Sequence, residues 1–461
     1  MVRPLNVLIL GGGASGTLLA IHLLCAKTET KVTLIERTSA VGKGIAYGSA
    51  HPIHLLNVRA ANMSAYPDLP DHFVRWLDEN DAERDGNGND RFRFASRAAF
   101  GNYLTSQLRE LQDATGRLKH IQGEAVSLSR TSNGVIVTLD NFRRVGGDLV
   151  VVATGYEPPE IEGMPPNVTP WLSVDRATLK HLESILLLGT GLSMVDHVQS
   201  LIAAGYQGTI YALSRRGLLP QPHRPIEPAV IDSSDVPFGE GLVTVFRWFR
   251  ARAEKAQREG SDWRAVLDGL RPHVQELWRG FSLDDQSRFV RHARPWWDVR
   301  RHRMAPRVAS IIEDLLASKR LVIIAAKIVS IAPETEGGIE VRYRRRGKFT
   351  VETLMVHGVT DCTGFSIDVA KMKNPLIRNL LAQGFTQPDR LGLGIDVDGA
   401  GALIDNHGHS APDIFAIGPL TRGAFWEIVG IPDIRTQCEC LTDQISEAAS
   451  RPTAPQRGAI R

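Results

Sequence analysis

The chain has 461 residues, of which 43% are hydrophobic and 23% carry a charge. This composition is typical of a soluble globular protein. The length exceeds what one hydrophobic core usually organises, so we expect two or three domains. A formal net charge of only +3 argues against nucleic acid as the main partner.

Other classes of protein are excluded by what the sequence lacks. No apolar stretch is long enough to span a bilayer. The apolar run near the start ends in a glycine turn, without the small-residue pattern of a signal peptide. Cys25, Cys362, Cys438 and Cys440 form no CxxC pair, so neither a disulfide framework nor a redox-active dithiol is indicated. The histidines lack metal-ligand spacing. We therefore expect a cytoplasmic protein without a metal or a membrane partner.

A strand, a glycine-rich turn and a helix follow one another early in the chain. Residues 6–10 form an apolar run typical of a buried parallel strand, residues 11–16 read Gly-Gly-Gly-Ala-Ser-Gly, and an apolar helix follows. In such a turn Gly11 permits the tight bend, Gly13 lets the backbone approach a pyrophosphate, and Gly16 lets helix and strand pack closely. The helix N-terminus offers N–H groups to the phosphates.

An acidic residue completes this pattern. A second strand spans residues 31–35, and Glu36 stands at its end, 20 residues beyond Gly16. A carboxylate at that place accepts hydrogen bonds from ribose hydroxyls. The combination predicts a dinucleotide site rather than an ordinary glycine-rich loop.

A second glycine turn occurs further along the chain. Gly189 and Gly191 follow a predicted strand at residues 184–188, and residues 209–213 form the next strand. Two such turns predict two bound dinucleotides, and a protein that passes electrons between them.

The remaining segments suggest how the domains are nested. Residues 148–155 read as a strand that runs into a glycine turn, and residues 360–364 repeat this turn as if the chain re-entered the first sheet. Residues 241–316 have a helical pattern rich in arginine and tryptophan. We expect an α/β protein with two Rossmann-like domains, the second inserted in the first, and a helical segment. The expected boundaries are 1–180 for the first part of one domain, 181–320 for the inserted domain, and 321–461 for the second part with a C-terminal tail.

Three further motifs carry a resemblance. They are Gly-Lys-Gly-Ile-Ala-Tyr-Gly at residues 42–48, His-Leu-Leu-Asn-Val at 54–58 and Gly-Pro-Leu-Thr-Arg-Gly at 418–423. Together with the glycine turns, they make the chain resemble a bacterial family of FAD/NAD(P)-binding oxidoreductases with two dinucleotide-binding domains. The best understood relatives of that family are the flavin-containing monooxygenases and the amino-acid N-hydroxylases.

The resemblance implies that the first site binds FAD. The glycine turn and Glu36 would hold its adenosine and pyrophosphate, and Gly418 would approach its ribityl chain. Pro419 departs from the family pattern, in which an aspartate follows this glycine; proline neither accepts through a side chain nor donates an N–H. Eight cofactor-binding candidates lie outside the second glycine turn and the strand that follows it. They are Gly11, Gly13, Ser15, Gly16, Glu36, Gly155, Gly364 and Gly418.

The second site is expected to bind NADPH. The resemblance assigns a nicotinamide cofactor to Gly189 and Gly191. The strand that follows ends in Ser214, Arg215 and Arg216, with no acid to accept from a ribose 2′-hydroxyl. Arginines there suit a 2′-phosphate through bidentate, charge-assisted hydrogen bonds. The alternative is that both arginines are solvated surface residues.

Two asparagines are the candidate catalytic residues. Within the segment 57–70, residues 62–70 are similar to the stretch of flavin-containing monooxygenases that passes beside the isoalloxazine. Asn57 is the nearest match to the asparagine of that stretch, one residue out of register, and Asn62 begins the similar run. An amide can donate to an oxygen atom and accept from a ring N–H without changing charge. The alternative is that each asparagine caps or turns the loop.

These features predict an FAD- and NADPH-dependent oxidoreductase. Our leading hypothesis is a monooxygenase in which NADPH reduces the flavin, molecular oxygen adds to it, and the peroxide oxygenates a small amine, sulfur or carbonyl substrate away from water. The alternatives are an NADPH-dependent reductase that passes electrons to a protein or quinone, and a flavin-bound redox sensor with little turnover. The substrate and the oligomeric state, a homodimer included, stay open.

A cation-aromatic cluster lies outside the nucleotide motifs. It would suit an anionic or amino-acid substrate, or brace NADPH. The alternative is a solvated helix face whose tryptophans are anchored in a domain interface. Its members are Arg288, Arg291, His292, Arg294, Trp296, Trp297, Arg300, Arg301, His302, Arg303 and Arg307.

Overall fold

The computed structural model describes residues 4–48, 53–80, 92–157, 168–170, 179, 181–334, 337–365 and 367–450. The expected C-terminal tail, residues 451–461, lies outside them. Within these ranges, no helix is both long and apolar enough to cross a membrane. The chain divides into two compact units. Unit 1 comprises Met1–Ala50, Ala60–Glu157 and Ile367–Arg461, and unit 2 comprises His51–Arg59 and Pro158–Ser366.

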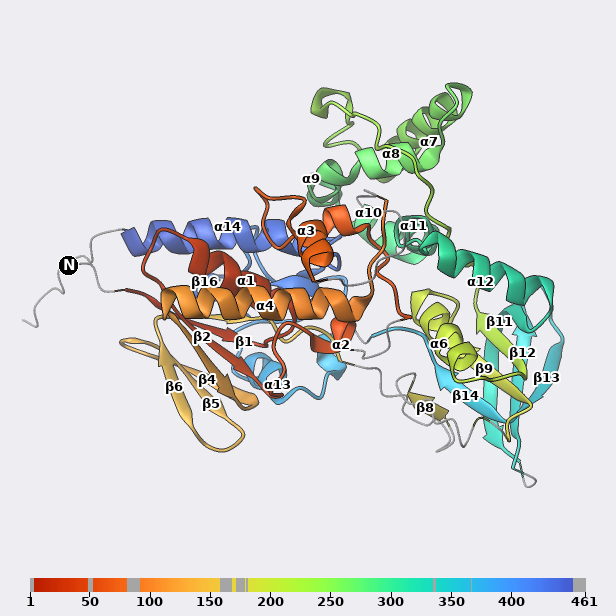
Figure 1. The fold of residues 1–461 in the computed structure, drawn as a ribbon, viewed down its shortest axis with the longest axis horizontal. Helices are drawn as coiled ribbons and strands as arrows, with labels where there is room; N and C mark the ends of the chain where they lie inside the picture. Colours follow the sequence, from red (N-terminus) through yellow and green to blue (C-terminus); the bar gives the residue numbers. More distant parts are fainter. Residues whose placement is uncertain are drawn as a thin grey trace, which may run out of the picture. The chain divides into compact units, whose positions relative to one another are not determined.

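Unit 1 is built on a six-stranded sheet with the order β15-β16-β7-β1-β2-β3 (Figure 1). All its strands are parallel except β15, which pairs antiparallel with β16. β1 is buried from Val7 to Leu10 because it is a central strand covered on both faces, which explains its uninterrupted apolar sequence. The strands are β1 (Asn6–Leu10), β2 (Lys31–Glu36), β3 (Leu118–Gln122), β7 (Leu149–Val152), β15 (Ala402–Ile404) and β16 (Ser410–Ala416).

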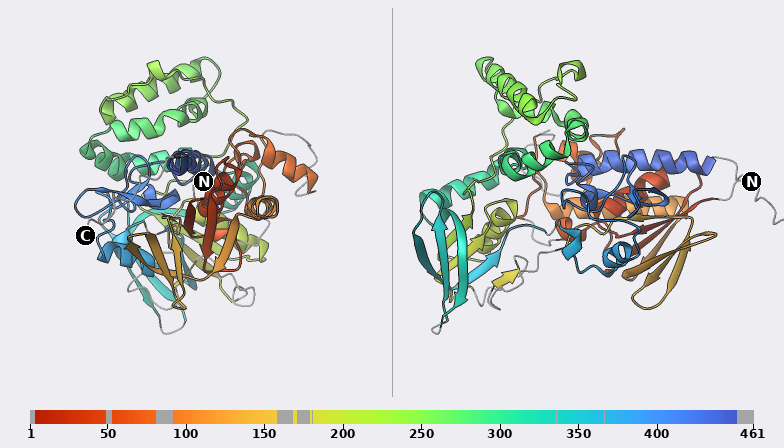
Figure 2. Two further views of the ribbon diagram at one scale, coloured as in Figure 1. Left: turned by 90° about the vertical axis from the view of Figure 1, so that its left-hand side faces the viewer. Right: turned by 180° about the vertical axis from the view of Figure 1, so that it is seen from behind.

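Helices cover one face of this sheet and a small antiparallel sheet covers the other (Figures 1 and 2). The helices on the first face are α1 (Ala14–Cys25), α4 (Arg97–Thr115) and α14 (Ile431–Ser450). The other face carries α13 (Pro375–Ala382) and the strands β4 (Ala125–Thr131), β5 (Gly134–Leu139) and β6 (Arg144–Gly147). Two short helices, α2 (Gly44–Tyr47) and α3 (His72–Glu79), lie in the connection between β2 and α4. In α1, every residue from Ser15 to Leu24 is buried, so this helix forms the centre of the covered face.

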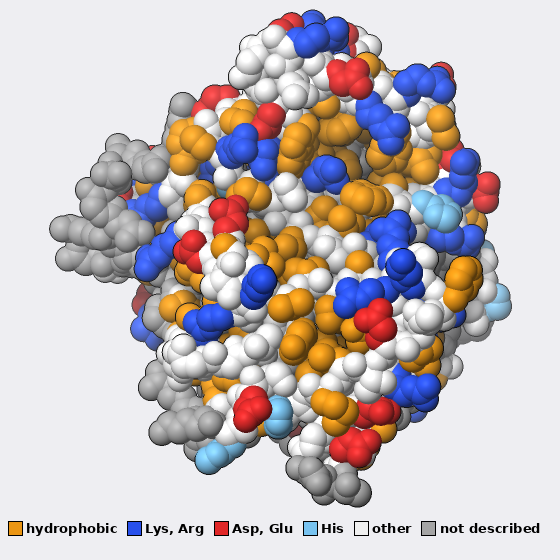
Figure 3. All heavy atoms as spheres, turned by 90° about the vertical axis from the view of Figure 1, so that its right-hand side faces the viewer, with side chains coloured by type: hydrophobic (Ala, Val, Ile, Leu, Met, Phe, Trp, Pro, Cys, Tyr) orange, Lys and Arg blue, Asp and Glu red, His pale blue; other side chains and the backbone are white. Residues whose placement is uncertain are grey.

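Unit 2 contains a seven-stranded sheet with the order β13-β12-β11-β10-β9-β14-β8. The strands from β8 to β11 in this order are parallel, whereas β11, β12 and β13 form an antiparallel meander. On the side that carries β13 in Figure 1, hydrophobic side chains are interleaved with Lys and Arg (Figure 3). The strands are β8 (Val168–Pro170), β9 (Ser184–Leu188), β10 (Thr209–Ser214), β11 (Leu321–Pro333), β12 (Ile339–Arg345), β13 (Val351–Val356) and β14 (Gly358–Asp361).

The predicted helical segment is confirmed, and it belongs to unit 2. Between α10 and α11 the chain forms a π-helical turn at Phe289–Ala293, just before Pro295 in the first turn of α11. The helices of unit 2 are α6 (Leu192–Ala203), α7 (Leu242–Arg258), α8 (Trp263–Gly269), α9 (Val274–Gly280), α10 (Leu283–Arg288), α11 (Arg294–Arg301) and α12 (Pro306–Ala317).

The α/β class and the two Rossmann-like units are confirmed, but the expected boundaries differ from those of the structure. Unit 2 extends to Ser366, whereas the sequence suggested an end at residue 320. Residues 360–364 do not re-enter the first sheet, because β14 pairs with β9 and β8 of unit 2. Gly364 therefore belongs to unit 2. The segment His51–Arg59 also belongs to unit 2, which the sequence did not indicate.

Candidate dinucleotide-binding sites

The first glycine turn joins β1 to α1. Gly11 has a φ of +111°, and a Cβ there would lie 2.5 Å from the carbonyl oxygen of Ala153. A Cβ on Gly16 would lie 1.9 Å from the carbonyl oxygen of Gly11. Gly13, the N-cap residue of α1, has an ordinary φ of −68°, and a Cβ on it would meet nothing closer than Gly44 Cα at 3.6 Å. A side chain here would therefore be in contact with Gly44, and the first N–H groups of α1 are those that such turns offer to a phosphate group.

Glu36 lies against this turn. Its Oε2 accepts a hydrogen bond from the N–H of Gly12 at 2.7 Å, and its Oε1 accepts from the N–H and the hydroxyl of Thr38, each at 3.1 Å. Gly42 N–H donates to the carbonyl oxygen of Gly12 at 2.8 Å, so the loop after Glu36 folds back onto the turn. Oε2 keeps a further lone pair, so Glu36 can also accept from a ribose hydroxyl.

Replacing Glu36 with glutamine is expected to weaken FAD binding about tenfold, or roughly 1.4 kcal/mol. A neutral amide accepts weaker hydrogen bonds than a carboxylate, and its NH₂ group cannot accept from Thr38. The dissociation constant of FAD, measured by fluorescence of the released flavin, checks this. Asp148→Asn is the matched control, because Asp148 Oδ2 accepts from Asn6 N–H (2.7 Å) at the opposite end of β1. Equal loss of FAD in both variants would contradict the role of Glu36.

A later turn of the chain meets the first glycine turn. Gly418, with a φ of +72°, begins the 3₁₀ helix η6 (Gly418–Thr421), and a Cβ on it would lie 2.4 Å from Oγ of Ser15. Gln437 on α14 holds this turn, since its Oε1 accepts from Gly418 N–H at 2.8 Å and its Nε2 donates to Thr421 Oγ1 at 3.1 Å. The backbone at Gly418 is thereby fixed against the first turn of α1.

Pro419 fits its place in this turn. It occupies the first turn of η6, where a fixed φ and a missing N–H are both favourable. The aspartate of the family pattern is absent, and Gln437 is the side chain that fixes the backbone here. Sequence reasoning missed Gln437, because a buried glutamine (8% exposed) within a long helix carries no local signal.

The second glycine turn repeats this geometry in unit 2. Gly189 also has a φ of +111°, and a Cβ there would lie 2.4 Å from the carbonyl oxygen of Cys362. Gly191 is the N-cap residue of α6, and a Cβ on it would meet nothing within 4 Å. The N-terminus of α6 is therefore open to a phosphate group.

Gly155 and Gly364 occupy matching places in the two units. Gly155 follows β7 with a φ of +70°, and Gly364 follows β14 with a φ of +101°. The N–H of Ala153 donates to the last residue of β1, and that of Cys362 to the last residue of β9, both at 2.8 Å. Gly364 therefore stands beside the second glycine turn, as Gly155 stands beside the first.

The end of β10, which is predicted to select the nicotinamide cofactor, lies beside the second glycine turn. Ser214, the last residue of β10, has its Oγ 2.9 Å from Thr190 Oγ1 and accepts from Gly217 N–H at 3.0 Å. Arg215 is exposed and Arg216 is half-buried. Within the described part of the chain, neither guanidinium has an ion-pair partner. Both arginines are thus available to an anionic ligand.

The two candidate catalytic asparagines belong to different units. Asn57 lies in the segment His51–Arg59 of unit 2, where its carbonyl oxygen accepts from His223 Nε2 at 3.0 Å. The same segment is held by His54, whose Nε2 lies 3.1 Å from Asp196 O and 2.8 Å from Ser200 Oγ on α6. Asn62 is exposed at the end of a 3₁₀ turn, Ala60–Asn62, in unit 1. The structure therefore does not bring Asn57 and Asn62 together within one unit.

The loop after Asn62 is held by three helices of unit 1. The carbonyl oxygen of Ala65 lies 2.9 Å from His22 Nε2 on α1, and its N–H donates to the hydroxyl of Tyr103 on α4 at 3.1 Å. Arg435 on α14 donates to the carbonyl oxygen of Ser64 at 2.7 Å. Burial lowers the pKa of His22 and raises that of Tyr103 to about 12, so both act here as neutral groups. Sequence reasoning missed all three side chains.

Lowering the pH from about 7.5 to about 5.5 is expected to reduce the stability of unit 2 by roughly 1.4 kcal/mol through His223. Burial and the nearby charge of Arg303 lower its pKa from 6.5 to about 3. The unfolded state takes up a proton below pH 6.5 while the folded state stays neutral, so stability is lost as the pH falls through this window. Urea unfolding at both pH values measures the loss. In His223→Asn the loss should shrink by that amount; an unchanged loss would contradict the assignment.

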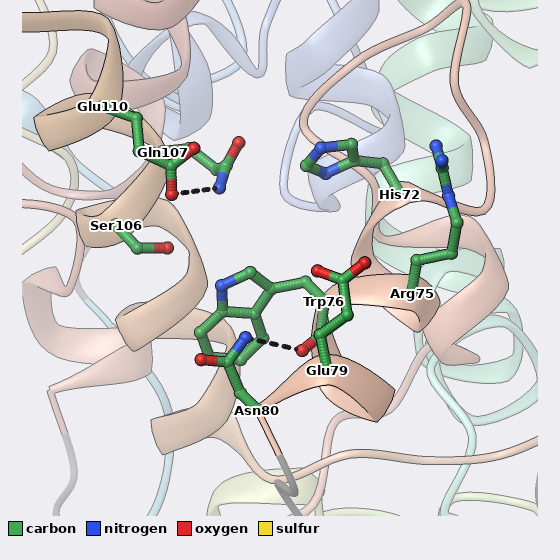
Figure 4. A pocket seen from close by; sticks show the side chains of 8 residues that line it. All are labelled: His72, Arg75, Trp76, Glu79, Asn80, Ser106, Gln107 and Glu110. Atoms are coloured by element: carbon green, nitrogen blue, oxygen red, sulfur yellow. Dashed lines mark hydrogen bonds between the residues drawn. The ribbon is translucent and has the colours of Figure 1, made fainter.

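A separate cavity of about 240 Å³ lies between α3 and α4 of unit 1 (Figure 4). Trp76 and Glu79 face it from α3, and Gln107 and Glu110 from α4. Gln107 Nε2 donates to Glu110 Oε1 at 3.3 Å. None of the predicted site residues lines this cavity, so it is distinct from both glycine turns.

Comparison with known proteins supports this description of the fold. Residues 8–157 match the model of a family described as FAD-NAD(P)-binding. None of the curated proteins compared with the chain matches its sequence significantly.

Solved structures of similar fold include an ornithine N-hydroxylase, a cadaverine monooxygenase and a thioredoxin reductase. Ornithine N-hydroxylase of Kutzneria sp. 744, solved with reduced FAD, NADP⁺ and L-ornithine, has 16% identity and a TM-score of 0.60 over 97% of this chain and 100% of that one. The cadaverine monooxygenase DfoA of Erwinia amylovora, solved with FAD, has 12% identity and a TM-score of 0.62 over 99% and 98%. Lactococcus lactis thioredoxin reductase has 13% identity and a TM-score of 0.52 over 96% and 98%. The chain thus contains an FAD-NAD(P)-binding domain at residues 8–157 and has the two-unit fold of flavin- and NAD(P)-dependent oxidoreductases.

Proposed function

We propose that the protein is an FAD- and NADPH-dependent monooxygenase that transfers one atom of molecular oxygen to a small amine, sulfur or carbonyl substrate. The observation that carries the proposal is the pair of equivalent glycine turns, one in each unit, with Gly13 and Gly191 as the N-cap residues of α1 and α6. FAD would be held by the turn at Gly11 to Gly16 with Glu36. NADPH would be held by the turn at Gly189 to Gly191 with Arg215 and Arg216.

The chemistry of oxygen transfer would be supplied by the flavin when it is bound. The part of the protein is to position both nucleotides and to keep water from the reacting atoms. Asn57 and Asn62 are proposed to hydrogen-bond at the reacting centre, because a neutral amide both donates and accepts. The fold is shared with proteins named ornithine N-hydroxylase and cadaverine monooxygenase, which favours an amine among the substrate classes.

The cysteines argue against a thiol-based reductase activity of the kind that the name thioredoxin reductase indicates. Burial raises the pKa of Cys362 and of Cys438, which disfavours the reactive thiolate form. Cys438 and Cys440 are two residues apart in α14, so their side chains point in different directions around the helix. The reductase alternative is therefore limited to electron transfer to a quinone or another protein, and the redox sensor is the other alternative.

Stopped-flow absorbance separates these functions. FAD-loaded protein is reduced with NADPH without oxygen and then mixed with oxygenated buffer. For a monooxygenase we expect an intermediate spectrum that persists before the oxidised flavin spectrum returns, and faster return when a suitable amine is present. Direct return to oxidised flavin would favour the reductase, and absence of reduction by NADPH would favour the sensor. Gly191→Val provides a control, since its flavin should remain bound but no longer be reduced at the normal rate.

A further inference from the structure

A buried arginine in unit 2 has hydrogen-bond donors that the protein does not satisfy. Arg303 lies between α11 and α12, and its side chain is 3% exposed. Its Nη2 pairs with Oδ1 of Asp268 on α8. Its Nε and Nη1 are buried and find no hydrogen-bond partner within the described ranges. Folded proteins rarely leave two donors of one charged group without an acceptor, because their desolvation is costly.

Positive charge exceeds negative charge around this side chain. Two carboxylates pair with arginines here: Asp262 with Arg264 at 2.8 Å, and Asp268 with Arg303. The ring of Trp263 has three guanidinium groups within 6.0 Å of its centroid, those of Arg264, Arg300 and Arg303. An additional anion would therefore improve the local charge balance.

The same cluster adjoins the segment that carries Asn57. Arg303 is close enough to His223 to help lower its pKa, after burial itself, and His223 Nε2 donates to the carbonyl oxygen of Asn57. The side chains in contact with Arg303 are partly accessible, since Asp268 is 22% exposed and Trp263 is half-buried. The guanidinium is thus buried in unit 2 beside side chains that are partly accessible.

We propose that Arg303 binds a carboxylate group of the substrate through its Nη1. The ligand class is a small carboxylic acid that also carries the amine or sulfur to be oxygenated. A carboxylate suits the site better than a phosphate dianion, because the three guanidinium groups around Trp263 exceed the carboxylates of Asp262 and Asp268 by a single positive charge. Identifying the ligand as the substrate rests on the proposed function, whereas the existence of the anion site does not.

Tryptophan fluorescence of the FAD-loaded protein tests the site, with sodium propionate as the carboxylate probe. We expect a saturable change in fluorescence that is lost in Trp263→Phe and is not produced by propylamine. The proposal is overturned if propionate gives no saturable change, or if the change survives in Trp263→Phe. It is also overturned if inorganic phosphate binds and propionate does not, or if propylamine binds equally well.

Two lysine variants locate the binding group. Arg303→Lys is expected to weaken propionate binding at least about tenfold, because lysine keeps the charge and can pair with Asp268 but lacks the unmet N–H groups. Arg252→Lys is the matched control, since Arg252 pairs with Asp235 at 2.7 Å and lies 5.1 Å from the ring centroid of Trp248. It should leave propionate binding unchanged. Equal affinity in wild type and Arg303→Lys would overturn the proposal.

A third variant is expected to strengthen propionate binding rather than weaken it. Asp268→Asn removes the competing carboxylate, so propionate is expected to bind several times more tightly. A purely structural Arg303 would give lower stability without tighter binding, and that result would count against the site. Because these titrations need no turnover, they are independent of the stopped-flow test. A protein that binds propionate as expected but fails to react with oxygen would retain the anion site and refute only the monooxygenase proposal.

Discussion

Replacing Gly16 with alanine is expected to yield a protein that retains no FAD and folds poorly. The added Cβ would lie 1.9 Å from the carbonyl oxygen of Gly11 and 3.1 Å from Cγ2 of Ile9. All these atoms belong to the buried contact between β1 and α1, so neither backbone can move without separating the helix from the sheet. The flavin absorbance of the purified protein and its unfolding midpoint measure the effect.

Gly13→Ala separates loss of the cofactor from loss of the fold. A Cβ on Gly13 meets Gly44 Cα at an ordinary contact distance of 3.6 Å, and its φ of −68° suits any residue. The variant should therefore unfold at the same temperature as the wild type. We expect it to lose FAD nevertheless, at least about tenfold in affinity or 1.4 kcal/mol, because the methyl group occupies the space proposed for the pyrophosphate. Full retention of FAD by Gly13→Ala would show that the pyrophosphate binds elsewhere.

The local features of the fold could be predicted from the sequence because they depend on neighbouring residues. The strand at Asn6–Leu10, the positive φ of Gly11 and the helix after Gly13 follow from an apolar run and a glycine spacing within a few turns of chain. The second turn at Gly189 was predicted for the same reason. Both were found where expected.

The pairing of distant strands could not be predicted in the same way. The motif at residues 360–364 resembles that at residues 151–155. In unit 1 an Xaa-Thr-Gly turn lies beside the first glycine turn, and in unit 2 a similar one lies beside the second. A sequence pattern shared by two sheets cannot show which sheet its strand joins. The partner strands β9 and β8 decide this for β14, and they lie far from it in the sequence. The domain boundary near residue 320 was wrong for this reason.

The supporting side chains of the site were also beyond sequence reasoning. Gln437 acts on Gly418 from another turn of the chain, and His22 and Arg435 act on a loop that is distant from both in sequence. Each is a polar residue within a helix, where the common reading is a solvated face. Only the burial and the hydrogen bonds in the folded unit distinguish such a supporting residue from a solvated one. The roles proposed for Asn57 and Asn62 remain predictions.

Replacing Arg215 with alanine is expected to weaken NADPH binding by roughly 1.5–3 kcal/mol, which is about ten- to a hundredfold, and to leave NADH binding nearly unchanged. Arg215 is exposed at the end of β10, beside the turn that holds Thr190, and has no ion-pair partner within the described residues. A guanidinium at this strand end can bind a 2′-phosphate with charge-assisted hydrogen bonds, and NADH lacks that group. Titration of the flavin-loaded protein with each nucleotide measures both affinities.

The control for this change is Arg342→Ala. Arg342 is an exposed arginine on β12 of the same unit, so its loss changes the net charge of the unit equally without altering the strand end at β10. If Arg215 acts only through the general positive field, both variants should weaken NADPH to the same small extent, and more strongly at low salt. If it contacts the 2′-phosphate, Arg215→Ala alone should remove the preference for NADPH. A loss shared equally between NADPH and NADH would place Arg215 at another part of the nucleotide and would leave the choice of cofactor to residues other than this strand end.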